Sequence, residues 1–515
     1  MACFVRRSPA TAHRYRYRNR HRYRKDGVER LVRNIDPDTD SDSDSEWISA
    51  IVLSAGVTLP PVNTLALILV VIYAVALLAL SAGKRGSGGV DYLLAGRRLT
   101  LPAFVATLVT TWYGGILGIG EYAWRFGIST WIVFGVPYYL AALIFAFWLA
   151  PRLRRSGAIT IPDLLVNAYG RKASSVGAAA VYASTVPVAY LLMVATLLAQ
   201  ITGWPVLMTV LIGAGFSTLY VSLSGFRAVV RTDMLQLVLM YGGFIILLPA
   251  ALAHTGGFEG LWGALPDSHR SWDGGLGWQT VVVWYLIALQ TVVEPSFYQR
   301  VFAARSPQIA RAGVLVSVAM WVVFDFFTVY SGLAARVLLP DLSDPMAAYP
   351  ALAGLVLSPW LAAFFIVALF ATVMSTLDSY LFIAATTIGH DFASTPASPD
   401  VVRRRTRIGL IISAGLAALG ALLFSSVVQV WHDIGSVVTS TLLLPVLAIH
   451  LPRAWKPSER GAVTAMIAAA ATASAWIWLR GNDGYFLGVE PMFPALLAAG
   501  FCLVIDGVFH RVATL

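Results

Sequence analysis

The sequence predicts an all-α membrane protein with about thirteen transmembrane helices, and both its composition and its hydropathy pattern support this fold class. Of the 515 residues, 58% are hydrophobic and only 12% are charged, and the mean hydropathy is +0.72. Soluble domains are about 45–50% apolar and about 25% charged. Apolar runs such as 62–82 and 130–150 are long enough to cross a hydrocarbon core of ~30 Å as helices. Because lipid offers the backbone no hydrogen-bond partners, these runs must be helical.

The composition also argues against several other classes of protein. Too few polar residues remain to coat the surface of a large soluble helical protein. The two cysteines, Cys3 and Cys502, and the scattered histidines form neither a disulfide framework nor a metal motif. We find no nucleophile–base pair and no phosphate loop, so we expect neither an enzyme nor an organic cofactor. The basic pI of about 9.6 reflects arginines in short loops, so we expect no nucleic-acid partner.

Residues 1–48 differ from the rest of the chain. Residues 6–33 contain 11 lysines and arginines, and residues 36–46 read DPDTDSDSDSE. Blocks of like charge do not fold alone, so we expect this tail to be disordered. The loop charges of the chain predict an external N-terminus, which would place these basic residues on the unfavourable side of the membrane. We therefore expect that the start of the chain is mis-set, rather than that the tail is translocated.

Thirteen apolar segments predict the spans, and the loops between them alternate in charge. If the loop after the first span is cytoplasmic, the cytoplasmic loops hold 22 lysines and arginines, whereas the opposite loops hold four arginines. This bias predicts a plasma (inner) membrane protein with its N-terminus outside and its C-terminus in the cytoplasm. The expected spans are 62–82, 101–124, 130–150, 175–201, 205–223, 232–253, 278–298, 309–335, 359–389, 407–430, 432–450, 461–479 and 490–509.

Ionisable residues within the spans are costly in lipid and usually have a function. Asp378 lies in the middle of its apolar run, whereas Glu294, Asp325 and Asp433 lie closer to span ends, where water reaches them. Four hydroxyl side chains near Asp378 share one helix face, at i, i+3, i+4 and i+7. Hydroxyl oxygens are suitable ligands for a small hard cation. The same side chains could equally form hydrogen bonds between helices. These four are Thr372, Ser375, Thr376 and Ser379.

The second span is rich in glycine, with Gly114, Gly115, Gly118 and Gly120 within seven residues. Clustered glycine allows two helices to pack closely. It also allows a helix to break, so that free carbonyl groups meet an ion at the bilayer midplane. The residues alone favour neither interpretation strongly, and packing is the commoner one.

Five segments, in order along the chain, resemble motifs of the sodium:solute symporter family. Each is weak alone, but five in order among thirteen spans make a strong match, which runs from about residue 90 to residue 407. The segments are 91–98 (DYLLAGRR), 159–170 (ITIPDLLVNAYG), 224–236 (SGFRAVVRTDMLQ), 299–306 (QRVFAARS) and 372–379 (TVMSTLDS).

This resemblance implies a symporter domain of residues 49–515, with a LeuT-like core of two inverted five-helix repeats at about 101–253 and 278–450. Broken helices in such a core hold substrate and ion near the midplane. The implied function is sodium-coupled symport of a small organic solute into the cytoplasm by alternating access. A first sodium site would use the carbonyl groups of Leu108, Thr111 and Thr372 and the hydroxyl groups of Ser375 and Thr376. A second sodium site would use Asp233, Asp378 and Ser379.

The substrate is expected between the two broken spans. Gly115 and Gln290 stand where the family's sugar carriers have a polar contact and an aromatic gate, which argues against a sugar. Thr110 stands where many members have an aspartate or asparagine. The residues therefore neither support nor exclude an amino acid as the substrate. Glu294, beside the helix-breaking Pro295, suits a substrate amine. Candidate substrate contacts are Trp112, Tyr113, Glu121, Gln290 and Glu294.

Two rival functions are compatible with the same spans. A proton-coupled carrier of the same fold would use Asp378 or Asp233 as its proton site. A non-transporting membrane sensor usually carries an added signalling domain, and only about six residues follow the last span, which argues against it.

Overall fold

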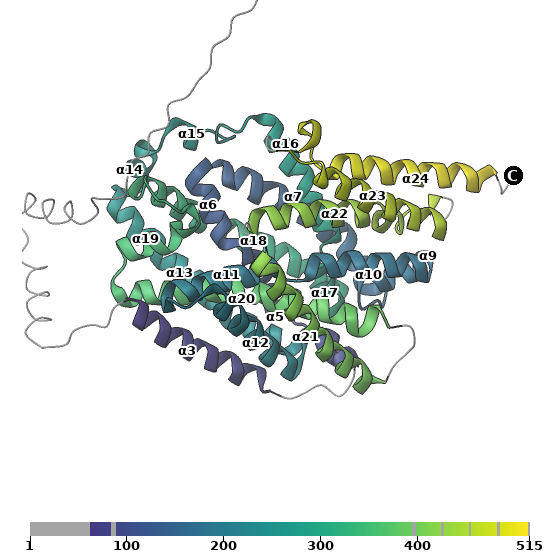
Figure 1. The fold of residues 1–515 in the computed structure, drawn as a ribbon, viewed down its shortest axis with the longest axis horizontal. Helices are drawn as coiled ribbons and strands as arrows, with labels where there is room; N and C mark the ends of the chain where they lie inside the picture. Colours follow the sequence, from purple (N-terminus) through teal and green to yellow (C-terminus); the bar gives the residue numbers. More distant parts are fainter. Residues whose placement is uncertain are drawn as a thin grey trace, which may run out of the picture. The chain divides into compact units, whose positions relative to one another are not determined.

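The computed structural model describes residues 62–83, 89–393, 398–423, 427–452, 455–481 and 485–512, which are almost entirely helical (Figure 1). The described residues contain no β-strand, and Leu99 and Ala304 form an isolated β-bridge. The predicted disorder of residues 1–48 lies outside the described residues.

The helices agree with the expected spans. Eleven helices among the described residues are long and apolar enough to cross a membrane, and each coincides with an expected span. The other two expected spans, 432–450 and 490–509, coincide with the shorter apolar helices His432–Ala448 and Met492–Val508. The prediction of an all-α protein with about thirteen spans is therefore confirmed.

Several spans consist of more than one helical segment. In chain order the spans are α3 (Val62–Ser81); α5 (Leu101–Trp112), η2 (Tyr113–Gly115) and α6 (Ile116–Phe126); η3 (Trp131–Gly135), α7 (Val136–Ile144), η4 (Phe145–Leu149) and α8 (Ala150–Arg155); α10 (Arg171–Thr185) and α11 (Val188–Thr202); α12 (Val206–Ser224); α13 (Phe226–Thr255); α16 (Trp278–Ile287), η5 (Ala288–Val293) and α17 (Pro295–Ala303); α18 (Pro307–Leu338); α20 (Pro359–Thr386) and η7 (Thr387–Asp391); α21 (Pro399–Leu423); α22 (Val427–Ala448); α23 (Glu459–Trp478); and α24 (Met492–Val512).

Short helices connect these spans. They are α4 (Gly89–Leu94), η1 (Ala95–Arg97), α9 (Ile161–Tyr169), α14 (Gly257–Ala264), α15 (Asp267–Arg270), η6 (Pro345–Ala347), α19 (Ala348–Val356) and η9 (Phe486–Gly488).

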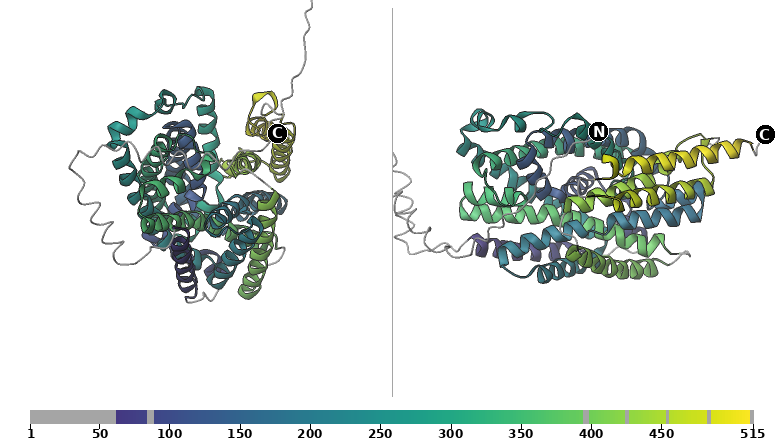
Figure 2. Two further views of the ribbon diagram at one scale, coloured as in Figure 1. Left: turned by 60° about the vertical axis from the view of Figure 1, so that its left-hand side comes forward. Right: turned by 45° about the horizontal axis from the view of Figure 1, so that its top comes forward.

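Helix α20 forms the centre of the bundle. It packs against α3, α5, α11, α12, α13 and α21, and 78% of its most apolar window is buried. The corresponding window of α3 is only 28% buried, and its exposed valine and isoleucine side chains suit contact with lipid. Helices α23 and α24 pack side by side against α22, away from α20, as the yellow segments in Figure 2 show. The hydroxyl-bearing α20 is therefore surrounded by protein.

The second, fourth and seventh spans are interrupted in different ways. The fourth span breaks between α10 and α11, where the φ and ψ of Val186, −65° and 114°, are extended. The second span changes from α-helix to a 3-10 turn at Tyr113–Gly115 and then continues as α6. The seventh span unwinds through the 3-10 segment η5 and breaks at Glu294, whose φ and ψ of −69° and 112° are extended. Pro295 starts α17 just after this break, because it donates no backbone hydrogen bond and suits the first helical turn. The helix break predicted from Pro295 is confirmed.

Candidate functional site

The residues expected to form the first sodium site lie where α5 ends against α20. The Thr376 hydroxyl donates to the Thr111 carbonyl oxygen over 2.9 Å, and it lies 3.4 Å from the Thr110 carbonyl oxygen. Gly114 makes this approach possible, because a Cβ atom there would overlap with the Thr376 side chain. Close helix packing and a change of helix type thus occur together at this glycine. Leu108 and Thr372 are also fully buried on the same two helices.

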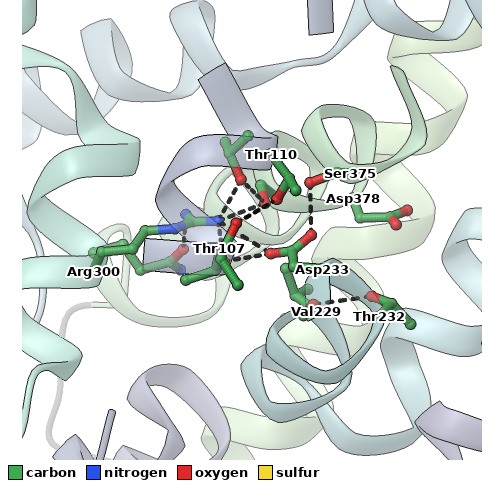
Figure 3. Close-up of polar contacts among 12 residues, drawn as sticks. Thr107, Thr110, Val229, Thr232, Asp233, Arg300, Ser375 and Asp378 are labelled. Carbon is green, nitrogen blue, oxygen red and sulfur yellow. Dashed lines mark hydrogen bonds and ion pairs between the residues drawn. The ribbon is translucent and has the colours of Figure 1, made fainter. Parts of the chain in front are cut away.

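A buried ion pair lies directly beside this contact (Figure 3). Asp233 on α13 accepts hydrogen bonds from Ser375, at 2.6 Å, and from Thr107. The Arg300 guanidinium group lies 4.0 Å from the Asp233 carboxylate, and both side chains are fully buried. The helices α5, α13, α17 and α20 therefore meet at one charged cluster in the bundle interior.

Arg300 also donates to the hydroxyl groups around it. Its Nη2 atom lies 2.6 Å from Ser379 Oγ, 2.8 Å from Thr111 Oγ1 and 3.0 Å from Thr107 Oγ1. Its Nη1 atom donates to the Gln299 side chain over 2.8 Å. A guanidinium group has five N–H donors in a rigid plane, so it can hold several acceptors at once.

The structure brings together some of the residues expected at the second sodium site and separates another. Asp233 and Ser379 both contact the Arg300 guanidinium group. Asp378 instead faces α12, where it accepts a hydrogen bond from Ser217 at 2.5 Å and another from Tyr220. Figure 3 shows its carboxylate pointing away from Asp233. The Asp378 carboxylate is therefore hydrogen-bonded to α12, whereas the Arg300 guanidinium group lies beside Asp233 and Ser379.

A cavity of about 240 Å³ extends from this region between the second and seventh spans, and the break of the fourth span also lines it. Four of the five expected substrate residues line it, namely Trp112, Tyr113, Gln290 and Glu294. The fifth, Glu121, is not among the lining residues, since its carboxylate pairs with Arg125 one turn further along α6, at 2.9 Å. Four of the residues predicted as substrate contacts are therefore among the cavity's lining residues, and their role as contacts stays a prediction.

Two carboxylates line the cavity. Glu294 accepts hydrogen bonds from the Tyr380 hydroxyl at 2.9 Å and the Ser296 amide at 3.3 Å. Asp325 accepts one from Tyr113 at 2.8 Å and another from Tyr139. The sequence placed Asp325 near a span end, but α18 extends well beyond it on both sides. Its approach to Tyr113 depends on tertiary packing and leaves no signal in the sequence.

Aromatic rings form much of the cavity wall. Trp112 stacks edge-on to Tyr138 with ring centroids 5.3 Å apart, and Phe134 and Trp284 lie 4.5 Å apart. Gln290, at the expected gate position, donates to the Tyr138 hydroxyl over 3.2 Å. Among the described lining residues there is no lysine or arginine. The cavity thus combines two carboxylates and one histidine, His432, with electron-rich ring faces.

A charged network stands at the side of the cavity formed by α22. His432 lines the cavity and lies 2.6 Å from the Tyr485 hydroxyl and 3.0 Å from Glu490. Asp433 accepts hydrogen bonds from Tyr485, at 2.9 Å, and from Arg480. The network joins α22 to the connection between α23 and α24.

Arg300 is the functional candidate that sequence reasoning missed. It follows the seventh expected span by two residues, a position that the hydropathy pattern assigns to a cytoplasmic loop. The signal was present in the QRVFAARS segment, which the family resemblance already singled out. The break at Glu294 starts a new helix at Pro295, and that helix carries Arg300 inside the bundle.

Comparisons with known proteins agree with this arrangement. The model of the sodium:solute symporter family matches residues 92–469, well over half of the chain. The chain belongs to this family. The Escherichia coli sodium/pantothenate symporter is 23% identical over 86% of this chain and 95% of its own length. The high-affinity choline transporter 1 of Caenorhabditis elegans is 22% identical over 72% of this chain and 69% of its own length.

A solved structure shows the same fold. A sodium-coupled sialic acid symporter in its outward-open state aligns with a TM-score of 0.72 and 19% identity, over 86% of this chain and 98% of its own. This symporter has the LeuT-like plan, so the predicted core with broken helices is confirmed. Membership of the family establishes the protein as a multi-pass membrane transporter that couples solute movement to sodium.

Proposed function

We propose that this symporter carries a small solute with an amine or quaternary ammonium group into the cell, with one sodium ion per cycle. The observation that carries the substrate class is the pair of carboxylates, Glu294 and Asp325, in an aromatic cavity. Its described lining has no lysine or arginine, and its histidine, His432, pairs with Glu490. Charges buried away from water need a partner. A cationic group would supply that partner, and aromatic faces attract quaternary ammonium groups. The similarity to a choline transporter supports the same class.

One sodium ion would bind where α5 meets α20. Its ligands would be the carbonyl oxygens of Leu108, Thr111 and Thr372 with the Ser375 and Thr376 hydroxyl oxygens. The short distance from Thr376 to the Thr111 carbonyl supports this set, because a sodium ion needs oxygens from both helices together. Asp233, one hydrogen bond away through Ser375, supplies negative charge nearby.

We further propose that Arg300 takes the place of a second sodium ion. Its guanidinium group already brings a positive charge to Asp233 and donates to Ser379. A second cation among these oxygens would meet repulsion from Arg300 in a medium of low dielectric constant. Asp378, the remaining residue of the expected second site, would then act structurally through Ser217 and Tyr220.

Sodium and substrate would be coupled through the second span. Thr111 contributes to the proposed sodium site, while Trp112 and Tyr113, the next residues, line the cavity. Sodium would fix this segment against α20 in the outward-facing state and thereby organise the pocket. Coupling of this kind is reciprocal, so substrate must also strengthen sodium binding. The bundle would then rock and release both into the cytoplasm.

The loop charges support an orientation with the N-terminus outside and the C-terminus in the cytoplasm of the plasma (inner) membrane. This places His432, Asp433 and Arg480 on the external side, and α9 and η7 on the cytoplasmic side. Labelling of Ser271→Cys, but not Ser156→Cys, by an impermeant maleimide in right-side-out vesicles of a Cys3→Ser/Cys502→Ala background would support this topology. The reverse labelling would contradict it.

Thermal stabilisation of the purified protein tests both the ion and the substrate class. We expect sodium to raise the melting temperature, potassium to have no effect, and choline or glycine betaine to add to the sodium effect. In Ser375→Ala and Thr376→Ala, the sodium concentration needed for half-maximal stabilisation should rise at least tenfold. Thr386→Ala is the matched control, because its hydroxyl bonds only to Phe382 within the same helix.

Three outcomes would contradict the proposal. Stabilisation by pantothenate or glucose, with none by ammonium compounds, would reject the substrate class. An equal loss in Thr386→Ala would show that the α20 variants act through general destabilisation. Stabilisation that depends on pH but not on sodium, and is lost in Asp233→Asn, would favour a proton-coupled carrier.

A further inference from the structure

A second polar cluster lies at the end of α20 remote from the cavity, and the transport cycle described above does not use it. It joins Asp163, in the first turn of α9, to His390 and Asp391, in the π-helical segment η7. One ligand atom from each residue can be chosen so that all three lie within 4.8 Å of one another. His390 Nε2 is 3.1 Å and 3.2 Å from the two Asp163 carboxylate oxygens.

The Asp391 carboxylate supplies a second and independent observation. Asp391 is buried, with only 5% of the residue exposed. Thr160 donates to its Oδ1 atom over 2.6 Å, but its Oδ2 atom is buried without a hydrogen-bond partner. A small cavity of about 20 Å³ is lined by Thr160 and Asp391. An unpaired buried carboxylate oxygen is costly, and a cation would satisfy it.

The neighbouring cation does not fill this role. Arg171 donates to the main-chain carbonyl groups of Asp391 and Ala393, at 3.3 Å and 2.5 Å, and not to either carboxylate. A protonated His390 would pair with Asp163 but would leave Asp391 Oδ2 without a partner. The cluster therefore offers two carboxylates and one imidazole to a single additional positive charge.

We propose that Asp163, His390 and Asp391 bind a divalent transition-metal ion such as zinc, cobalt or manganese. One imidazole nitrogen and two carboxylate oxygens are the ligand types these ions accept, and three protein ligands leave room for water. The Asp163 and His390 side chains are 27% and 25% exposed, so an ion can reach them from solution. The ion would clamp α9 and the loop before it to the end of α20.

This clamp would act on the helix that carries Thr372, Ser375 and Thr376. Alternating access requires α20 and its neighbours to move relative to one another. A metal ion that ties η7 to α9 would restrain the end of α20 and slow transport. Binding of the metal does not depend on the proposed substrate or on sodium coupling, so it can be tested alone.

Cobalt is a suitable probe, because its visible absorption reports the ligands directly. In full-length protein stripped with a chelator, cobalt titration should give a saturable band that zinc displaces. His390→Ala and Asp391→Asn should weaken cobalt binding about 100-fold. His254→Ala is the matched control, because its ring contacts only the Ala250 carbonyl of its own helix. His390→Cys should restore binding with a new thiolate-to-cobalt band, which a structural ion pair would not produce.

The fold of each variant is checked by its melting temperature in sodium. Equal cobalt affinity in the original protein and in both His390→Ala and Asp391→Asn would overturn the proposal. So would the absence of any cobalt, zinc or manganese binding at millimolar concentration by the original protein.

Discussion

The Arg300–Asp233 pair is the residue-scale feature on which the ion chemistry depends. Both side chains are fully buried, and together they bring four helices into contact. Desolvating two charges costs several kcal/mol per ion, and only their mutual attraction and hydrogen bonds offset this cost. The hydroxyls of Thr107, Thr111 and Ser379 provide those hydrogen bonds.

Removing one partner of this pair should therefore be worse than removing both. We expect Arg300→Gln and Asp233→Asn each to destabilise the protein by about 3–5 kcal/mol, since each leaves an uncompensated buried charge. The double variant should recover a large part of this loss. Melting temperatures of the three variants in detergent provide the measurement.

The exposed pair of Arg125 and Glu121 provides a matched comparison. Arg125→Gln should change stability by less than about 1 kcal/mol, because water screens this pair. If the losses of stability from Arg300→Gln and Asp233→Asn simply add in the double variant, the two residues are not coupled. The proposal that Arg300 takes the place of a second sodium ion then fails.

Individual residues were predictable from the sequence to different degrees. The shared helix face of Thr372, Ser375, Thr376 and Ser379 follows from helical periodicity, and all four side chains are buried in α20. Arg300 was not predictable in this way, because the helix break at Glu294 moves the boundary between span and loop. The engagement of Asp378 with Tyr220 depends on packing between distant helices and has no local signature.

At the scale of the element, the contact of α5 with α20 depends on a single missing side chain. Gly114 lies in the 3-10 turn of the second span, where a Cβ atom would overlap with Thr376. The sequence left close packing and helix breaking as alternatives for this glycine cluster. The structure combines them, because the turn changes the helix type at the same point where the two helices touch.

Gly114→Ala should therefore impair sodium binding more than it impairs folding. Overpacking of this kind typically costs about 1–3 kcal/mol, and here it separates the Thr111 carbonyl from the Thr376 hydroxyl. We expect a tenfold or greater rise in the sodium concentration needed for half-maximal thermal stabilisation. In Gly215→Ala, where no atom lies within 4 Å of the added Cβ, sodium dependence should be unchanged. Normal sodium dependence in Gly114→Ala would contradict the proposed site.

At the scale of the whole molecule, hydropathy was sufficient to predict the fold class. Lipid forces each apolar run into a helix, so the position of every span could be read directly from the sequence. Pro295 indicated the break of the seventh span. Composition and periodicity do not encode which helices surround α20 or how the cavity is lined, because these features follow from tertiary packing.

The number of charges moved per cycle tests two proposals in one measurement: the single sodium ion at the buried cluster and the cationic substrate in the cavity. One sodium ion with a monovalent ammonium solute moves two charges. At 100 mV and a tenfold sodium gradient, this supplies about 6 kcal/mol, which supports roughly 10⁴-fold accumulation. In proteoliposomes, parallel fluxes of radioactive sodium and choline, together with current, should give one sodium ion and two charges per choline. Two sodium ions and three charges would show that a second sodium ion binds despite Arg300.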